Sequence, residues 1–485
     1  MISDAQYLAW LRSQAPKVLL AEMDYYDTVT ESVGTAYISD RGYNTNWSDG
    51  VEHRPYPDYL KGVPSARRTL GSGRPARGEL IIDNTAGERD HWLTQYKWDG
   101  RKVRLLYGDP SWEYADFRLV FIGVIKTRYG RGIDELLFKM REPEDFLDQP
   151  VQGSTVASGP NAGDYLPICY GECFNVSPVL LDGATHVYQV SDIAIDSVDL
   201  VKDNGKGPVS HTADLAAGTI TLAGAPVGNI TVDCTGAKIG GAPLLKAGEI
   251  IDHIITERTD LPAEFYDASA FTALDTEITW QHNLYINGST TARQAIDMIL
   301  ESIGAKLSRT EAGAITVVLL ADPTESAGIT ISPDDYRMDT LVASATELPW
   351  KRGRLGYRRN WTVQESLDTL VTATERATLG REYSIVEDAN AVTGVHPLAT
   401  EPELIGTTLT LEADAAERLA QLMALHAVER YKFDLQVYAV LYQYALGSTV
   451  KLIADRYGFD AGINCVVYDT DSVFTDGRAR LTLWR

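Results

Sequence analysis

The sequence predicts a mainly β fold with a few helices, an α+β chain built from several domains. Short segments rich in β-branched and aromatic residues recur along it, each bounded by Gly, Asp or Pro. The apolar period of a helix is confined to a few segments. The length of 485 residues corresponds to about three domains of typical size. The helices and strands predicted in each region support this expectation.

Residues 1–148 are expected to form a first β-rich domain that begins with a short helix. Ser3 and Gln6 have the spacing of a capping box, and Pro16 would end the helix. Strands are predicted at Val103–Leu105 and Phe117–Val124. A small, polar stretch over residues 149–163 is then typical of a linker or exposed loop.

A second β-rich domain is expected over residues 164–243. Its predicted strands are Val187–Val190, Val198–Lys202 and Thr219–Leu222.

Residues 244–345 are expected to form an α+β domain. Helical periodicity covers Leu244–Glu257 and Ala292–Ile303. The second of these helices has Thr291 and Gln294 at capping-box spacing and Gly304 after its end. A hairpin of Lys306–Ser308 and Ile315–Leu320 follows.

Residues 346–485 are expected to form a C-terminal domain with one helix. The helix is predicted at Ala413–Tyr431, and Leu435–Leu446 has a strand-like pattern. The closing strands are predicted at Val450–Ile453, Cys465–Tyr468 and Leu481–Leu483.

The charge balance argues against a nucleic-acid-binding protein. The chain has 44 Lys and Arg against 67 Asp and Glu, a formal net charge of −23. A protein that binds a phosphate backbone needs a cationic face to release its counterions. The sequence has no apolar run long enough for a membrane span, and four cysteines do not form a disulfide scaffold. We therefore expect synthesis in a reducing cytoplasm.

Motifs for nucleotide or metal binding are absent from the sequence. It contains neither a P-loop nor a dinucleotide-binding glycine pattern. Cys169, Cys173, Cys234 and Cys465 include a single loose pair, so buried free thiols are the favoured interpretation over a zinc or iron–sulfur site. His253 and His426 lie in helical patterns, where hydrogen-bonded histidines are common. No cofactor or metal is expected.

Acidic clusters and hydrolase signatures give no positive evidence for an enzyme. Asp469, Asp471 and Asp476 lack the remaining positions of a calcium-binding loop and are expected to be solvated turn carboxylates. There is no nucleophile elbow and no cysteine-protease signature. A glycosidase needs only two carboxylates, so this class stays open.

One cationic segment interrupts the acidic background. It lies between Trp350 and Trp361 and is a candidate subunit interface. Its members are Lys351, Arg352, Arg354, Arg358 and Arg359. The alternative is an alternating strand with Leu355 and Tyr357 inward and the cations in water, and a phosphate contact is the weakest of the three interpretations.

Three stretches in the same order resemble the baseplate hub, or tail-tip hub, of long-tailed bacteriophages. The similarity is greatest to the version in siphophages with Mu-like virion modules. The first stretch is GRPARGELIIDNTAGERDHWL, GRKVRLLYGD and FRLVFIGVI; the second is LPICYGECFNVSPVLLD, YQVSD, VDLVKDNG and GTITLAGAPVGNITVDCTG; the third is GSTVKLIADRYGFDAG and RARLTLWR.

The resemblance implies a structural virion protein rather than an enzyme. It implies barrel-like domains resembling tail-tube folds, and a homotrimeric ring at the tail tip that adapts a six-fold tube to a three-fold tip. The implied neighbours are the distal tail protein, the tape-measure protein and the central tail fibre. The genome would pass through the ring during ejection without specific binding.

Two other functions remain open: a receptor- or glycan-binding tail module and, more weakly, a cell-wall hydrolase of the tail tip. The glycan-binding alternative requires an exposed aromatic platform. For the hub, we expect the acidic excess to face the central channel and Lys351–Arg359 to face a neighbouring chain.

Overall fold

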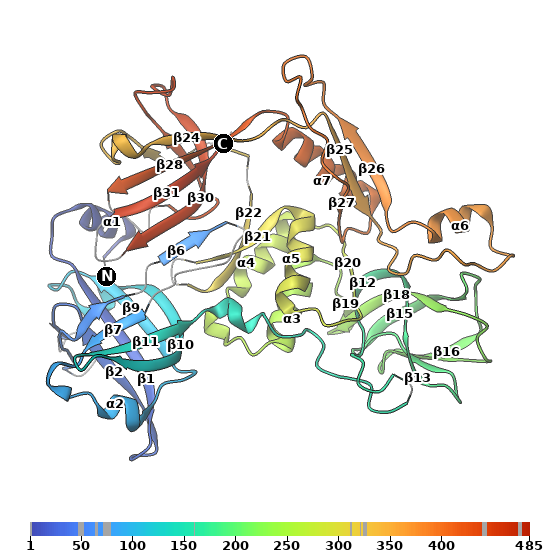
Figure 1. Cartoon of the computed structure of the whole chain (residues 1–485), viewed down its shortest axis with the longest axis horizontal. Helices are drawn as coiled ribbons and strands as arrows, with labels where there is room; N and C mark the ends of the chain where they lie inside the picture. The colour runs from blue at the N-terminus through green and yellow to red at the C-terminus, as the bar shows by residue number, and fades with distance from the viewer. Residues whose placement is uncertain are drawn as a thin grey trace.

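The computed structural model confirms a mainly β chain made of several sheets around a central group of helices (Figure 1). It describes residues 2–46, 53–63, 66–70, 79–159, 161–310, 313–320, 322–323, 327–438, 444–473 and 478–485. Within these residues, no helix has the length and apolar composition of a membrane span.

The first sheet, drawn in blue and cyan in Figure 1, has the strand order β2-β1-β9-β10-β11-β7-β5, with β8 paired to β1. Its strands are β1 (Val18–Asp27), β2 (Ser32–Ser39), β5 (Leu60–Gly62), β7 (Glu79–Asp83), β8 (Tyr96–Lys97), β9 (Lys102–Gly108), β10 (Arg118–Arg131) and β11 (Glu135–Arg141). A short ladder joins β3 (Tyr43–Asn44) to β4 (Pro55–Tyr56), and α2 (His91–Thr94) precedes β8.

The N-terminal helix α1 (Asp4–Arg12) is confirmed and packs on this sheet. The Gln6 amide donates to Ser3 Oγ at 3.3 Å, and Ser3 N–H donates to Gln6 Oε1 at 2.9 Å, which completes the predicted capping box. Tyr7 and Trp10 join a buried aromatic cluster that includes Trp98 and Phe138. The apolar face of the helix thereby closes the core of the sheet.

Residues 164–243 form two further antiparallel sheets, drawn in green. One has the order β15-β18-β12-β20, with β19 paired to β18, and the other has the order β13-β14-β17-β16. The strands are β12 (Ile168–Val176), β13 (Val179–Asp182), β14 (Val187–Gln189), β15 (Ile195–Asp203), β16 (His211–Asp214), β17 (Thr219–Leu222), β18 (Ile230–Ile239), β19 (Ala242–Pro243) and β20 (Asn283–Ile286). β20 lies beyond the expected boundary at residue 243.

The central helices bury the largest apolar cluster of the molecule. They are α3 (Ala247–Arg258), α4 (Ala268–Glu277) and α5 (Ala292–Ile303), followed by the hairpin β21 (Ala305–Arg309) and β22 (Ile315–Leu319). The prediction for Ala292–Ile303 is confirmed: Thr291 Oγ1 accepts from the Gln294 amide at 3.2 Å, and Gly304 ends the helix at φ +76°. The sequence pattern did not predict α4.

The range expected to be one C-terminal domain divides between two sheets. β25 (Arg352–Tyr357) lies between β26 (Ser384–Ala389) and β27 (Ile405–Gly406), and α7 (Glu412–Leu425) packs on this sheet. The other sheet contains β28 (Arg430–Tyr438), β29 (Thr449–Leu452), β30 (Ile463–Val473) and β31 (Arg478–Trp484), together with β23 (Ile329–Ile331) and β24 (Val342–Glu347), which begin in the preceding range. Its order is β23-β29-β30-β31-β28-β24.

The helix content of this range also differs from the prediction. Its described residues contain two helices, α6 (Ala373–Leu379) and α7 (Glu412–Leu425), rather than one. The predicted helix Ala413–Tyr431 ends at Leu425, because Tyr431 and Phe433 belong to β28, where both pair with β24 and Phe433 also pairs with β31. Of the predicted strand Leu435–Leu446, residues 439–443 lie outside the described part of the chain.

Strand β6 (Ala66–Thr69) links the two ends of the chain. It follows β5 of the first sheet, yet it pairs antiparallel with β30 in the C-terminal sheet, with Thr69 opposite Asp469. Leu70 is buried in the core of that sheet, and its amide donates to the Tyr468 carbonyl at 2.8 Å. The first region is thus joined to the last by a backbone ladder (Figure 1).

A second link joins the first sheet to the central helices. The buried Arg309 side chain on β21 donates from Nε to Glu144 Oε1 at 2.7 Å and from NH2 to Glu142 Oε2 at 2.7 Å. Burial raises the pKa of the Glu142 carboxyl, and Arg309 opposes that shift. The stretch 149–163 is packed in part and exposed in part: Val151 is buried, and its amide donates to the Thr290 carbonyl at 2.9 Å, whereas residues 153–155 and 157–159 are exposed, as expected for a loop.

Candidate functional site

The cationic segment is built on β25, the middle strand of its sheet. Leu355 is fully buried, and Tyr357 is half-buried against the same core, as the alternating-strand interpretation expected. Gly353 allows α7 to approach closely, because a Cβ there would lie 2.6 Å from Met423 Sδ. The neighbouring Arg352 side chain is exposed.

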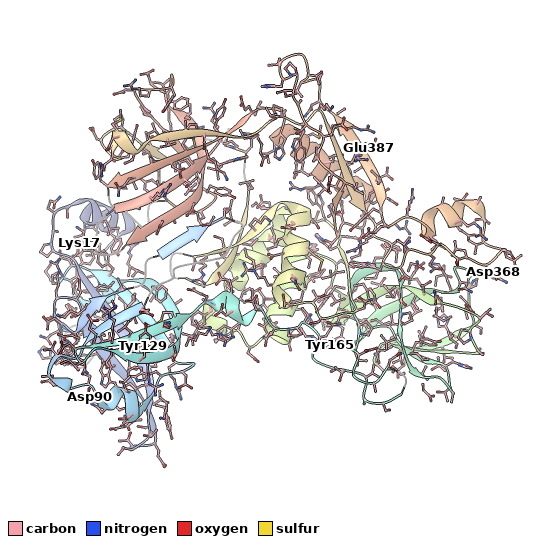
Figure 2. The ribbon with its side chains drawn as sticks, viewed as in Figure 1. Lys17, Asp90, Tyr129, Tyr165, Asp368 and Glu387 are labelled. Atoms are coloured by element: carbon pink, nitrogen blue, oxygen red, sulfur yellow. The ribbon has the colours of Figure 1, made fainter. Side chains whose placement is uncertain are left out.

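Three of the five cations form ion pairs within the chain. Arg352 NH2 lies 2.5 Å from Glu387 Oε2, and Arg359 NH2 lies 2.8 Å from Glu382 Oε1. Lys351 Nζ lies 3.5 Å from Glu401 Oε1. Figure 2 shows Glu387 on β26, at the outer side of this sheet. Because each of these carboxylates is at least partly in water, each pair contributes no more than about 1 kcal/mol.

Arg358 and Arg359 also pack on aromatic rings. The Arg358 guanidinium lies 4.1 Å from the ring centroid of Phe174, on the second β-rich region, and that of Arg359 lies 4.2 Å from Trp361. Burial raises the pKa of the Glu172 carboxyl, and Arg358 opposes the shift. Arg358 therefore joins the β25 sheet to the β12 sheet, whereas Arg359 packs on a ring two residues away in its own segment.

Arg354 differs from the other four. It is half-buried, and no ion pair or ring contact within the described part of the chain involves it. Its register partner on β26 is Glu387, which already pairs with Arg352. Arg354 is thus the member of the predicted interface that is best placed to meet a second chain.

A buried amide network holds the loop that follows the cationic segment. Asn175 Nδ2 donates to Asn360 Oδ1 at 2.8 Å, and Gln364 Nε2 donates to Asn175 Oδ1 at 3.2 Å. Asn360 Nδ2 donates to the Leu379 carbonyl at 2.9 Å, at the end of α6. The cationic segment is therefore fixed at its C-terminal end by contacts far apart in sequence.

The cysteines divide between two cores. Cys169, Cys173 and Cys234 are buried together, with Cys173 opposite Cys234 in the β12–β18 ladder, whereas Cys465 lies in the C-terminal sheet. A set of four thiolates around one ion is therefore not assembled. Burial raises the pKa of the Cys169 thiol well above its usual range, and it raises that of Cys465 to about 12. Among the described residues, no group of His, Cys, Asp and Glu could hold a metal ion.

The two histidines singled out in the sequence have partners in the fold. His253 Nδ1 lies 3.1 Å from Tyr170 Oη, and burial lowers the pKa of His253. The ring of His426 stacks on Trp350 at 3.9 Å between centroids. Asp469 and Asp471 are strand residues of β30 rather than turn residues, and Asp476 lies outside the described part of the chain.

The sequence patterns missed a cavity beside the C-terminal sheet. Its volume is about 1120 Å³. Aromatic side chains from β28 and from the loop after β29 line it, together with Arg430, Lys451 and Arg485. The only signal in the sequence was spacing: Tyr431 and Phe433, two residues apart, share one face of a strand.

The chain has no match among protein-family models or curated protein sequences. Among solved structures it is similar to the tail protein from Neisseria meningitidis MC58, with 9% identity over 92% of this chain and 96% of that chain and a TM-score of 0.41. It is also similar to the prophage tail protein gp18 from Listeria monocytogenes EGD-e, with 9% identity, coverage of 97% and 94%, and a TM-score of 0.44.

A third similar structure is the 43 kDa tail protein of prophage MuSo2 from Shewanella oneidensis. The identity is 9%, the coverage is 96% of this chain and 98% of that chain, and the TM-score is 0.41. Because all three TM-scores are below 0.5, these similarities assign neither a fold family nor a function to the chain.

Proposed function

We propose that this chain is a structural component of a phage-type tail, and that it serves as a subunit of the baseplate or tail-tip hub. The observation that carries the proposal is the order of the three stretches that resemble hub proteins. Their described parts include inner strands of three separate sheets: β9 and β10, β12 and β18, and β29 and β31. Each of the three stretches therefore contributes to the folded core of a different region.

In this proposal the chain acts as a homotrimeric ring below the tail tube, which adapts a six-fold tube to a three-fold tip. The distal tail protein, the tape-measure protein and the central tail fibre are its neighbours. The protein is made in the host cytoplasm and resides in the virion. The ladder between β6 and β30 suits such a role, because it resists separation of the first sheet from the last.

The acidic composition fits a channel wall. We propose that many of the Asp and Glu residues that give the chain its net charge of −23 face the lumen. There, like-charge repulsion keeps the genome from adhering during ejection. The cationic segment then faces a neighbouring chain. A trimer whose lumen is lined by Arg352, Arg354 and Arg358 would contradict this placement.

Averaged electron-microscopy images of purified tails provide the direct test. We expect antibody against this chain to label the tail tip, and we expect density for three copies in a ring. A chain present in infected cells but absent from purified tails would overturn the proposal. Zymography on peptidoglycan tests the non-enzymatic assignment, for which we expect no clearing.

Light scattering after size-exclusion chromatography tests the cationic interface. We expect the Arg354→Glu variant to shift the protein from trimer towards monomer, because Arg354 has no ion pair inside the described chain. The exposed Lys126 on β10 supplies the control, and Lys126→Glu should leave the trimer intact. An unchanged trimer in Arg354→Glu would remove Arg354 from the interface.

A further inference from the structure

The cavity beside the C-terminal sheet has an aromatic wall. Tyr431 and Phe433 on β28 have ring centroids 6.4 Å apart, and Phe433 meets Phe459 edge-on at 5.4 Å. Tyr457 continues the row, 5.9 Å from Phe459. All four rings line the same cavity of about 1120 Å³. The result is a row of four rings with solvent at both ends.

The middle of the row lies in the core, and its two ends lie in water. Phe433 is buried among the apolar side chains of the sheet, whereas Tyr431 is 36% exposed and Tyr457 is 61% exposed. Tyr457 has φ +61°, a conformation that a bulky side chain rarely adopts. The loop thus holds a large aromatic ring in solvent at the cost of backbone strain.

The charges that line the cavity leave a positive surplus. Glu429 accepts a hydrogen bond from Tyr431 Oη at 2.8 Å, and Asp322 acts electrostatically on the buried Arg430. Against these two carboxylates stand Arg430, Lys451 and Arg485, a surplus of one positive charge among the lining side chains, and no side-chain ion pair within the described residues involves Lys451 or Arg485. In a chain with a net charge of −23, this positive surplus is an exception.

Aromatic faces and cations together define a class of ligand. The CH groups on one face of a pyranose ring pack on an aromatic ring, and the hydroxyl groups at its rim bond to polar side chains. An ammonium or guanidinium group adds affinity for a carboxylate on the sugar. An apolar peptide would use the rings but not the cations, and a free anion would use the cations but not the rings.

We propose that this cavity binds an acidic oligosaccharide, a chain of pyranose units that carry carboxylate groups. One sugar ring stacks on Tyr457 and a second on Tyr431, while a carboxylate meets Lys451 or Arg485. The proposal is independent of the hub assignment, since it concerns a site within one chain. A structural subunit with this site would also contact a polysaccharide surface.

Isothermal titration calorimetry on the full chain tests the proposal, with tetragalacturonate as the acidic probe and maltotetraose as the neutral probe. We expect tetragalacturonate to bind with a dissociation constant on the order of 0.1–1 mM at low salt. Maltotetraose should bind at least about fivefold more weakly. Raising the salt concentration should reduce this difference, because the preference is electrostatic.

Two variants separate the two halves of the site. Tyr457→Ala should weaken tetragalacturonate binding by about threefold to tenfold, because the stacked ring is lost. Lys451→Gln should remove most of the preference for the acidic probe and leave the binding of maltotetraose unchanged. Both side chains are at least partly exposed, so we expect the thermal midpoint of the chain to be preserved.

Matched controls come from the same sheet and the same charge type. Tyr438, at the other end of β28, is 50% exposed and does not line the cavity, so Tyr438→Ala should bind as the parent does. Lys126→Gln should preserve the acidic preference.

Each contrary result would overturn the proposal. If neither tetragalacturonate nor maltotetraose binds at 10 mM, the cavity is not a saccharide site. Equal binding of the two probes would exclude the role of the cations. Equal loss of affinity in Tyr457→Ala and Tyr438→Ala would exclude the aromatic row as the sugar platform.

Discussion

Two groups of cationic side chains in this molecule have opposite environments. Those near β25 are largely used inside the chain: Arg352 pairs with Glu387, Arg359 with Glu382, and Arg358 covers Phe174. In the cavity beside the C-terminal sheet, Lys451 and Arg485 form no side-chain ion pair within the described residues, although Asp322 and Glu429 line the same space.

The difference shows that a run of cations in a sequence does not indicate which cations remain unpaired in the folded chain. Five cations within nine residues attract attention, yet acidic residues of β26 and of the loops before and after it pair with three of them. Lys451 and Arg485 of the cavity lie 34 residues apart and form no motif. We expect pairing, burial and exposure to determine how much each group contributes to stability, and the expected effects are given from the largest to the smallest.

The buried Arg309 is the extreme case of an internally paired cation. Arg309→Met would leave the buried Glu144 and the half-buried Glu142 without their counter-ion, and we expect it to lower the free energy of unfolding by about 3–5 kcal/mol. Urea denaturation followed by tryptophan fluorescence measures this change. Arg131→Met breaks the exposed pair with Glu135 and should cost less than about 1 kcal/mol. Equal losses of unfolding free energy in the two variants would show that burial does not determine how much an ion pair stabilises the fold.

The β25 strand should owe its stability to its apolar face rather than to its cations. Leu355 is fully buried, and Leu355→Ala should cost about 2–5 kcal/mol in the same denaturation experiment. Ile385, half-exposed on the neighbouring strand, provides the control, and Ile385→Ala should cost much less. A smaller loss for Leu355→Ala than for Arg352→Ala would reverse this interpretation.

The fully buried His282 should make stability depend on pH. Burial lowers the pKa of His282 to about 3, whereas its ordinary value is 6.5. The unfolded chain therefore takes up a proton that the folded chain refuses, and stability is lost as pH falls below about 6.5.

Urea midpoints between pH 7.5 and pH 4.5 measure this effect. His282→Asn should reduce the slope of stability against pH by about one proton, and the same change at the exposed His91 should leave it unaltered. A slope that is identical in His282→Asn and the parent would show that His282 is not the responsible group.

The smallest effect is expected for the exposed pair of Arg352 and Glu387. A double-mutant cycle with Arg352→Met and Glu387→Gln should give a coupling energy of about 0.2–1 kcal/mol, which salt should reduce. A coupling above about 2 kcal/mol would mean that this pair is shielded from water, and the segment would then resemble the Arg309 cluster.

Local patterns predicted several elements correctly because their signals are short in range. The capping boxes of α1 and α5 involve residues three apart, and both helices begin where the sequence indicated. The strands around Val103, Thr219 and Ile315 likewise follow from β-branched runs between turn residues. The mainly β class could be predicted for the same reason.

Other features depend on distant contacts that no local pattern contains. Tyr431 continues the apolar spacing of α7, but pairing with Ala345 of β24 places it in a strand. Part of the expected linker 149–163 packs, because Val151 bonds to the backbone of Thr290, while residues 153–155 and 157–159 stay exposed. The candidate site shows the same limit: the sequence identified the cations near β25 but not the carboxylates that pair with them.

The sequence by itself determined the fold class, the best-capped helices and the acidic character of the chain, because these depend on composition and on neighbours within a few residues. Tertiary structure decided where the charges are neutralised, how three cysteines share one core, and how β6 joins the C-terminal sheet. It also gathered Tyr431, Phe433, Tyr457 and Phe459 around one cavity. These outcomes depend on which surfaces remain unburied once each sheet has formed, and that is a property of the whole chain.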